Sequence, residues 1–321
     1  MTYVLPGQEL TFQLVGGKWL LKKKVFMLIL WGVLTIASAI GIWLCGKYDY
    51  GLLEAIAGAL IAIFMERGAI AIQDLMDTTD WKASQRKLKR GGFISDDTII
   101  RISFAYLFRI KVGDEYFLVQ NSRNTGKYQP VGGVYQLKGD EKALLKNLYH
   151  VMDDNKIPID ESSRDDYRLR MKNKYLRKFM KRFDNKKAER ERIENVGREF
   201  REELIDTGVF SWEKITYRYC GRHITELRFE EHFQIYELLL ADIVELIPTS
   251  EQEQDLKKLM GHKSEKYRFA KEKQITCLGM DIESGNLYEW IGDHTKKILQ
   301  EQESTLKKMP GTGDKYTIDL R

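Results

Sequence analysis

The feature that most constrains this chain is a run of 21 residues without a charge, residues 25–45, close to its start. At about 1.5 Å of rise per helical residue, this run reaches about 31 Å, which matches the hydrocarbon core of a bilayer. A signal-peptide core is shorter, about 7 to 15 residues, and a small-residue cleavage site follows it. The run at 25–45 has neither property, so the sequence predicts a transmembrane helix there.

A second apolar stretch, residues 52–72, follows a short turn at 46–51. It carries Glu54 near its start and the pair Glu66 and Arg67 near its end. Because ionisable groups at membrane depth are costly, these side chains are expected to reach the headgroups or to face a partner. The sequence thus predicts a two-helix transmembrane hairpin, preceded by an N-terminal segment at 1–24.

Small residues recur four positions apart in both predicted helices: Ala37 and Gly41, Ala55 and Ala59, Gly58 and Ala62. Such rows let helix backbones approach each other closely in lipid, where no hydrophobic force drives association. They suit packing inside one hairpin and packing between hairpins equally well, and the sequence leaves both alternatives open.

Basic residues mark one side of the predicted hairpin. They precede the first helix at positions 18 and 22–24 and follow the second at 82, 86, 87, 89 and 90, whereas the turn holds only Lys47. Both chain termini are therefore expected in the cytoplasm. Cys45, Cys220 and Cys277 agree with this, because an odd number of widely separated cysteines indicates reduced thiols rather than a disulfide framework.

The rest of the chain is polar and alternates strand and helix patterns. Residues 73–94 are expected to form a connecting helix and linker, and residues 95–300 a mixed-sheet α/β (α+β) domain with a basic helical insertion at 140–192. Residues 301–321 are expected to form a polar tail that is mobile from residue 308 onward. A β-hairpin is predicted at 99–110 and 116–119, and two further strands at 215–222 and 232–244. Helices are predicted at 141–152, 164–192, 252–260 and 293–300.

The basic character of the chain is local. Residues 168–192 contain twelve Lys and Arg against three acidic residues, a surplus larger than the net charge of +5 for the whole chain. A solvated helix face explains this run, and so does contact with an anionic ligand or with an acidic membrane surface. Sequence-specific DNA recognition is not expected beside a membrane.

The strongest chemical signal is a cluster of carboxylates at 198–203, Arg-Glu-Phe-Arg-Glu-Glu. Glu199, Glu202 and Glu203 are spaced i, i+3 and i+4 in a predicted helix, so their carboxylates share one face. Oxygen ligands of this kind suit Mg²⁺, which can in turn hold a pyrophosphate. The alternative is a structural cluster paired with Arg198 and Arg201.

The order of strand hairpin, Pro-Val-Gly-Gly turn and Arg-Glu-Phe-Arg-Glu-Glu helix resembles the Nudix fold. The resemblance spans residues 95–300 and implies that Glu199, Glu202 and Glu203 are metal ligands, that Arg198 braces the preceding loop, and that Gly132 and Gly133 lead into the motif. Tyr128 joins Gly132, Gly133 and Arg198 as a candidate ligand-binding residue, with Mg²⁺ as the metal if one is retained. No residue is assigned a catalytic role.

Three positions depart from the Nudix pattern. About 60 residues separate Gly133 from Arg198 where the family has about a dozen, Arg190 stands in the place of an upstream glutamate, and the closing glycine is displaced to Gly208. With its two N-terminal spans, the chain resembles the two-transmembrane SMODS-associated Nudix effectors of bacterial CBASS anti-phage systems. That resemblance implies a multi-pass protein of the inner membrane that senses a cyclic oligonucleotide, forms homo-oligomers and disrupts the bilayer.

Two other functions fit the sequence. The first is a membrane-tethered, Mg²⁺-dependent Nudix hydrolase of a nucleoside diphosphate derivative, which the intact motif at 198–203 favours and Arg190 opposes. The second is a structural membrane adaptor without ligand or reaction, for which the basic run would suffice.

Overall fold

The computed structural model describes residues 6–48, 50–76, 81–121, 126–161, 163–280, 285–287 and 289–321, with side chains from residue 25 onward apart from 73–76. The chain divides into two compact units, one up to Arg86 and one from Lys87 to Arg321. Each unit is described by itself below.

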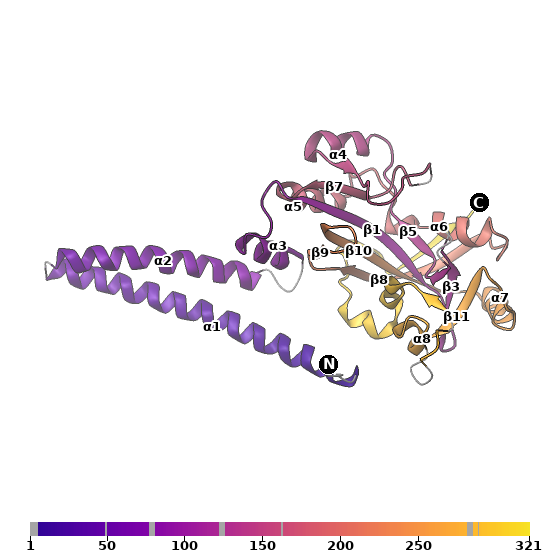
Figure 1. Ribbon diagram of the computed structural model, residues 1–321, viewed down its shortest axis with the longest axis horizontal. Helices are drawn as coiled ribbons and strands as arrows, with labels where there is room; N and C mark the ends of the chain where they lie inside the picture. Colours follow the sequence, from indigo (N-terminus) through magenta and orange to yellow (C-terminus); the bar gives the residue numbers. More distant parts are fainter. Residues whose placement is uncertain are drawn as a thin grey trace. The chain divides into compact units, whose positions relative to one another are not determined.

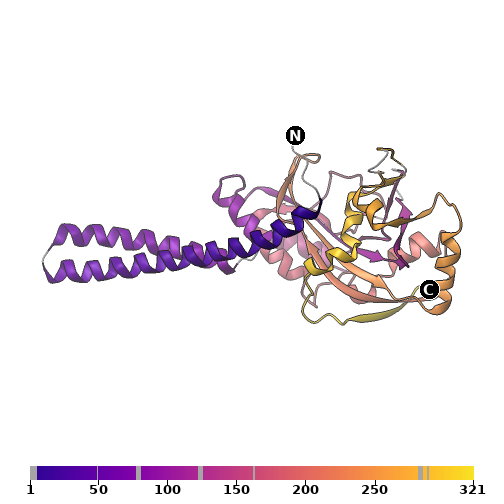
Figure 2. The ribbon, with the colours of Figure 1, turned by 90° about the horizontal axis from the view of Figure 1, so that it is seen from below.

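The first unit is a pair of long helices, α1 (Pro6–Lys47) and α2 (Gly51–Met76), which run side by side (Figures 1 and 2). Within them, Val25–Lys47 and Gly51–Ile72 are long and apolar enough to cross a membrane. Helix α1 continues to Pro6 without a break, so the predicted segment at 1–24 is helical from residue 6. The short helix α3 (Trp81–Arg90) follows, and residues 77–80 of the predicted linker lie outside the described residues.

The two helices pack through aromatic and small residues. The rings of Trp31 and Phe64 lie 5.9 Å apart. A methyl group placed on Gly68 would meet the Cβ of Trp31 at 3.8 Å, and one on Gly41 would meet the Cβ of Ala57 at 4.0 Å. Gly41 and Gly68 are therefore used inside the hairpin, where a small residue allows close approach of the backbones.

A different row of small residues points away from this contact. Ala55, Ala59 and Ala62 are exposed, and no atom lies within 4 Å of the position that a Cβ on Gly58 would take. The two alternatives left open by the sequence thus fall to different residues: Gly41 serves the hairpin, whereas Ala55, Gly58, Ala59 and Ala62 point away from the neighbouring helix.

The second unit is built on a large mixed sheet with the strand order β13-β8-β10-β1-β7-β6, with β5 paired to β1 and β9 to β10. Its central pair, β1 and β10, is parallel, and the other pairs are antiparallel. The strands are β1 (Ile99–Arg109), β5 (Gly132–Val134), β6 (Met152–Asp153), β7 (Arg168–Lys172), β8 (Lys214–Ile224), β9 (Arg228–Glu230), β10 (Ile235–Leu246) and β13 (Lys315–Asp319).

A smaller sheet has the order β11-β3-β4-β12, with β2 paired to β3. Its strands are β2 (Lys111–Val112), β3 (Glu115–Gln120), β4 (Lys127–Gln129), β11 (Tyr267–Lys271) and β12 (Trp290–Ile291). Helices α4 (Glu141–Tyr149) and α5 (Asn173–Phe183) lie beside β7, and α7 (Ser250–Met260) and α8 (Glu272–Thr276) lie near the smaller sheet (Figure 1). Two short 3-10 segments, η3 (Asp293–Ile298) and η4 (Gln300–Thr305), precede β13.

The inserted segment is fixed to the large sheet by a buried ionic network. The guanidinium of Arg222 on β8 lies 2.8 Å from Asp242 on β10 and 2.7 Å from Asp184 at the end of α5. The hydroxyls of Tyr135 and Tyr219 donate to the same Asp242 carboxylate. The buried Asp242 carboxylate is satisfied by these several donors. Because Arg222 also binds Asp184, the network ties the insertion to the sheet.

The structure confirms the mixed-sheet class with two apolar N-terminal helices and corrects three local predictions. The hairpin predicted at 99–110 and 116–119 closes at the expected turn, where the Phe117 amide donates to the Ile110 carbonyl at 2.9 Å. The partner of β3 there is the short strand β2, however, and β1 joins the large sheet. The predicted helix at 164–192 begins only at Asn173, since Arg168–Lys172 alternates buried and part-buried residues and pairs with β1 as strand β7.

The third correction concerns the C-terminal tail. Residues 315–319 form β13, which pairs with β8 along its whole length, and Ile318 and Leu320 are buried. The alternation of Tyr316 and Ile318 with polar residues is the strand signal that a polar composition concealed. The polar tail predicted at 301–321 therefore starts in η4 and ends in an edge strand of the large sheet.

Candidate ligand-binding site

A cavity of about 1220 Å³ opens over the central strands of the large sheet. Its floor consists of alternate residues of β1 and of β10, since side chains i and i+2 of a strand face the same side. These residues are Arg101, Ser103, Ala105 and Leu107 of β1, with Leu239 and Ala241 of β10, and Leu240 between the last two also borders the cavity. Usual small-molecule sites have volumes of about 300 to 1,000 Å³, so this cavity has room for a larger ligand.

The carboxylate motif lines one end of this cavity, on a helix that starts as α6 (Arg198–Phe200) and continues as the wider π-helical turn η2 (Arg201–Ile205). Phe200 and Leu204 are buried, and the Phe200 ring packs 5.3 Å from that of Phe108 and 6.0 Å from that of Trp212. The apolar face of the helix thus holds its acidic face toward the cavity. Gly208 has a φ of +74°, as expected for a glycine after a helix end.

Gly132 and Gly133 let strand β5 come very close to this helix. The amide of Gly132 donates to Glu203 Oε2 at 3.0 Å. A Cβ on Gly133 would overlap the Glu199 carboxylate, and Gly132 has a φ of +140° that other residues rarely adopt. The long insertion therefore does not separate the two parts of the motif in space, because β5 and the helix meet directly.

Arg198 organises the carboxylates around it. Its Nη1 lies 2.7 Å from Glu199 Oε1 and 3.4 Å from Glu202 Oε2, and its Nη2 donates to the carbonyl of Val134 at 2.9 Å. The same Nη2 lies 3.5 Å from Glu191 Oε2. The bracing role predicted for Arg198 agrees with these contacts to the strand and to the loop before the helix.

Glu191 is a site residue that the sequence did not reveal. Its carboxylate is buried, accepts the hydroxyl of Tyr106 at 3.1 Å and the amide of Gln136 at 3.3 Å, and faces Arg198. Arg190, which stands in the place of the upstream glutamate, instead lies 3.8 Å from the centre of the Phe183 ring. The glutamate is thus displaced by one residue, and a one-residue tolerance in the motif would have found it.

Burial makes this end of the cavity unfavourable for negative charge. Burial raises the pKa of Glu203 well above its ordinary value, and the nearby charge of Glu199 raises it further, while the Gly132 amide opposes both effects. Burial also raises the pKa of Glu191 and of Glu202, in each case against the lowering effect of Arg198. A compensating cation or a proton is therefore favoured here.

The fit of a divalent metal to these donors can be judged from their contacts. Arg198 engages Glu199 and Glu202, and the Gly132 amide engages Glu203. Among the described residues, no group of three or more His, Cys, Asp or Glu side chains converges in a way that could hold a metal ion. In this arrangement the guanidinium of Arg198 supplies the positive charge, and the residues do not form a set of ligands for Mg²⁺.

Tyr128 lies apart from the other predicted site residues. It is buried in the small sheet, its hydroxyl donates to the carbonyl of Glu265 at 3.0 Å, and Arg268 lies 5.0 Å from its ring centre. Its neighbour Gln129 lines the cavity, but Tyr128 does not. The structure thus brings together Gly132, Gly133, Arg198, Glu199, Glu202 and Glu203 and leaves Tyr128 outside.

Other walls of the cavity come from segments that the sequence did not connect with the site. The insertion contributes Ile157, Asp160, Ser163, Asp166 and Arg168, and the 3-10 segment η3 contributes His294 and Lys297. The only sequence signal for the last pair is their i, i+3 spacing near the end of the domain, which is too common to identify a site.

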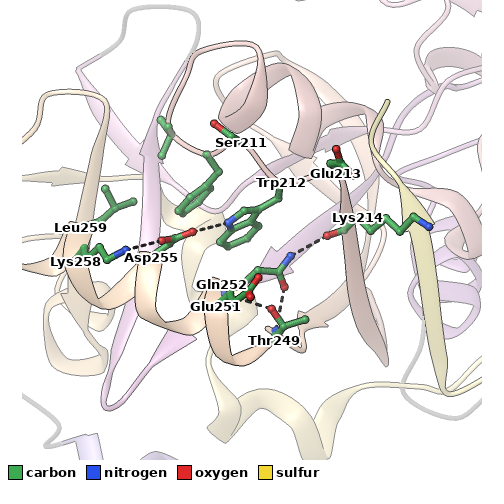
Figure 3. A pocket seen from close by; sticks show the side chains of 12 residues that line it. Ser211, Trp212, Glu213, Lys214, Thr249, Glu251, Gln252, Asp255, Lys258 and Leu259 are labelled. Carbon is green, nitrogen blue, oxygen red and sulfur yellow. Dashed lines mark hydrogen bonds and ion pairs between the residues drawn. The ribbon is translucent and has the colours of Figure 1, made fainter.

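A second cavity, of about 720 Å³, lies between the loop after the carboxylate helix and the start of α7 (Figure 3). Its polar groups bind one another: Trp212 Nε1 donates to Asp255, Lys258 pairs with Asp255, and Gln252 bonds to Thr249 and to the carbonyl of Lys214. Because these groups are already satisfied, this cavity is a structural junction at the capped start of α7.

Of the comparisons with known proteins, one identifies the family of the chain. No curated protein sequence matches the chain significantly. A solved structure described as a UDP-X diphosphatase has 10% sequence identity and a TM-score of 0.25 over 88% of this chain and 95% of that one, a likeness that carries no argument. The family model of the SMODS-associated NUDIX domain matches residues 99–299, which is more than half of the chain. With the motif at 198–203 lining the cavity and two apolar helices before it, the chain belongs to the SMODS-associated NUDIX domain family.

Proposed function

We propose that the chain is a membrane effector of anti-phage defence in which the NUDIX domain binds a cyclic oligonucleotide and the apolar hairpins then oligomerise and disrupt the inner membrane. The observation that carries the proposal is the cavity: it exceeds usual small-molecule sites in size, and Arg198 rather than a metal set organises its carboxylates. Such a cavity suits retention of a large nucleotide more than rapid turnover.

The residues around the cavity offer the groups that nucleotide recognition requires. Glu202 and Glu203 can accept hydrogen bonds from ribose hydroxyls or base amino groups, because carboxylates are acceptors with several lone pairs. Basic residues at Arg101, Arg168 and Lys266 line other parts of the wall. These contacts make and break no covalent bond of the ligand, so the proposal assigns no catalytic residue.

The hairpin supplies the second half of the proposal. The exposed row Ala55, Ala59 and Ala62, with Gly58 beside it, is free of α1 and offers a surface on which a second hairpin can pack closely. Clustering of ligand-bound domains would raise the local concentration of hairpins and favour this contact. The positive-inside bias supports a topology with both termini in the cytoplasm, where a nucleotide made inside the cell would reach the NUDIX domain.

A membrane-tethered Mg²⁺-dependent Nudix hydrolase is the alternative, and one observation favours it. Glu191 replaces the missing upstream glutamate and faces Arg198, so the motif is more complete in space than in sequence. Movement of Arg198 away from Glu199 and Glu202 would be needed before those carboxylates could share a metal.

The experiment that separates the two uses the full chain in detergent micelles. Calorimetry with cyclic di- and trinucleotides measures binding, and release of phosphate or nucleoside monophosphate from nucleoside diphosphate derivatives with Mg²⁺ measures hydrolysis. Binding in the micromolar range or tighter without turnover supports the effector. Turnover that Glu203→Gln abolishes, without binding of any cyclic nucleotide, supports the hydrolase.

A further inference from the structure

The wall of the main cavity formed by η3 contains a lysine in an unusual position. Thr295 and Ile298 of this segment have no exposed surface. The carbonyl of Lys297 lies 3.1 Å from His223 Nε2, and the carbonyl of Ile298 accepts Arg109 Nε. The backbone that carries Lys297 is therefore fixed against the large sheet, and Lys297 itself lines the cavity.

The other cations that line this cavity from the sheet, the insertion and the carboxylate helix have acidic partners. Arg101 lies 2.9 Å from Asp154 and 2.9 Å from Glu237. Arg168 lies 2.9 Å from Asp166, and Arg198 pairs with Glu199. Lys297 differs: within the described part of the chain, its ammonium group has neither an ion-pair partner within 4.0 Å nor a hydrogen bond.

The surroundings of Lys297 disfavour its charge. Burial lowers the pKa of Lys297, and the charge of Arg228 lowers it further, while the charge of Glu237 opposes both effects. The Glu237 carboxylate is already bound to Arg101. A desolvated charge without a partner is unfavourable, and a bound anion would remove that cost.

The position of the carboxylates decides where an anion can bind. Glu203 meets Gly132 on β5, which pairs with one edge of β1, whereas the Lys297 carbonyl binds His223 on β8, on the far side of β10. β5 and β8 are separated by β1 and β10, or about 14 Å across the sheet. The negatively charged end therefore repels a phosphate, and the end near Lys297 attracts it.

From this arrangement we infer that Lys297 is the phosphate-binding residue of the cavity, with the half-buried imidazole of His294 beside it as a second donor. The inference rests on the proposed function, because it names the part of a nucleotide that this wall holds. The carboxylate end is then left for uncharged hydrogen-bond donors of the same ligand, such as ribose hydroxyls and base amino groups. Because the Lys297 end of the cavity prefers phosphate and the carboxylate end prefers uncharged donors, the nucleotide would bind in one direction only.

Inorganic pyrophosphate is the probe that tests the phosphate site without the rest of the ligand. Calorimetry on the full chain in detergent micelles, at a fixed 150 mM salt to screen exposed lysines, should show that Lys297→Met weakens pyrophosphate binding about tenfold or more, as expected for loss of a charge-assisted contact. Lys297→Arg keeps the charge and should retain most of the affinity. Lys257→Met, in an exposed lysine of α7 that pairs with Glu253 and does not line the cavity, is the control and should change the affinity by less than about twofold.

A thermal melt separates loss of binding from loss of folding. Met removes a buried charge and keeps the volume, so Lys297→Met without ligand should unfold at the same or a higher temperature than the wild type. Unchanged pyrophosphate affinity in Lys297→Met overturns the inference, even if cyclic nucleotides bind and the proposed function stands. Tenfold weaker pyrophosphate binding supports the inference, even if no cyclic nucleotide binds and the proposed function fails.

Discussion

The Nη2 of Arg198 lies 3.5 Å from Glu191 Oε2, across a loop in which the glutamate is displaced by one residue from its place in the Nudix pattern. Glu191 is in turn fixed by Tyr106 and by the amide of Gln136. The guanidinium therefore joins the loop, the helix and strand β5 at one point. This contact explains how a motif with an altered sequence keeps a compact geometry.

Arg198→Met should destabilise the NUDIX domain by about 3 kcal/mol, because it leaves Glu191 and Glu199 without their shared cation in a partly buried place. Arg201→Met is the control on the same helix. Arg201 lies 3.7 Å from Asp206 and both are exposed, so this change should cost less than about 1 kcal/mol. Denaturant unfolding of the full chain measures both. Equal losses in the two variants would contradict the central place of Arg198.

The histidine in the cavity wall gives stability a pH dependence. Burial lowers the pKa of His294 to about 4, and the charge of Lys297 adds to this effect, as does that of Lys127, whereas Asp293 opposes it. The unfolded chain then binds more protons than the folded one between about pH 6.5 and pH 4, so stability falls as the pH falls through this window, by at most about 3 kcal/mol.

Replacing this histidine should flatten that part of the profile. His294→Gln cannot take up a proton, so its stability should change less than that of the wild type between pH 6.5 and 4. His262→Gln, at an exposed position, should follow the wild type. Thermal melts of the three proteins across the window measure the difference. A His294→Gln profile that is parallel to the wild type would show that His294 is not held neutral by the fold.

The mixed sheet and the carboxylate helix follow from local sequence signals. The β-branched and aromatic residues of 99–109 and the apolar positions Phe200 and Leu204 have the spacing that these elements need. The pairing of β1 with β10 does not follow, because it joins segments more than 130 residues apart and depends on the packing of both faces. The role of Lys297 does not follow for the same reason, since it arises only when distant segments meet, whereas Glu191 lies one residue from its place in the motif.

The topology of the hairpin can be tested by cysteine labelling in intact cells. In a background without Cys45, Cys220 and Cys277, a cysteine at Tyr48 should react with a membrane-impermeant maleimide, because the turn is expected outside the inner membrane. A cysteine at Gln300 should react only after the cells are permeabilised. Labelling of the second position in intact cells would reverse the predicted orientation.

The exposed small residues of α2 should matter for membrane damage and not for ligand binding. Changing Gly58 and Ala59 to Leu adds bulk where no atom of the neighbouring helix lies near Gly58, so the hairpin should form but should not pack closely against another. Depolarisation, followed with a membrane-potential dye in cells that make the nucleotide signal, should be lost. Ile56→Leu, at an exposed position of similar bulk, is the control and should leave depolarisation intact.

Two results would count against this assembly surface. Unchanged depolarisation in the Leu variant would show that hairpins meet elsewhere. Loss of both nucleotide binding and depolarisation in the Leu variant would indicate misfolding, because Gly58 and Ala59 belong to the unit that does not contain the cavity.

Calorimetry of cyclic oligonucleotides with the full chain tests the central claim most directly. The account predicts that one cyclic di- or trinucleotide binds with micromolar or tighter affinity and is recovered intact after incubation with Mg²⁺. No binding of any cyclic nucleotide, together with Mg²⁺-dependent hydrolysis of a nucleoside diphosphate derivative that Glu203→Gln abolishes, would contradict it and identify the chain as a hydrolase.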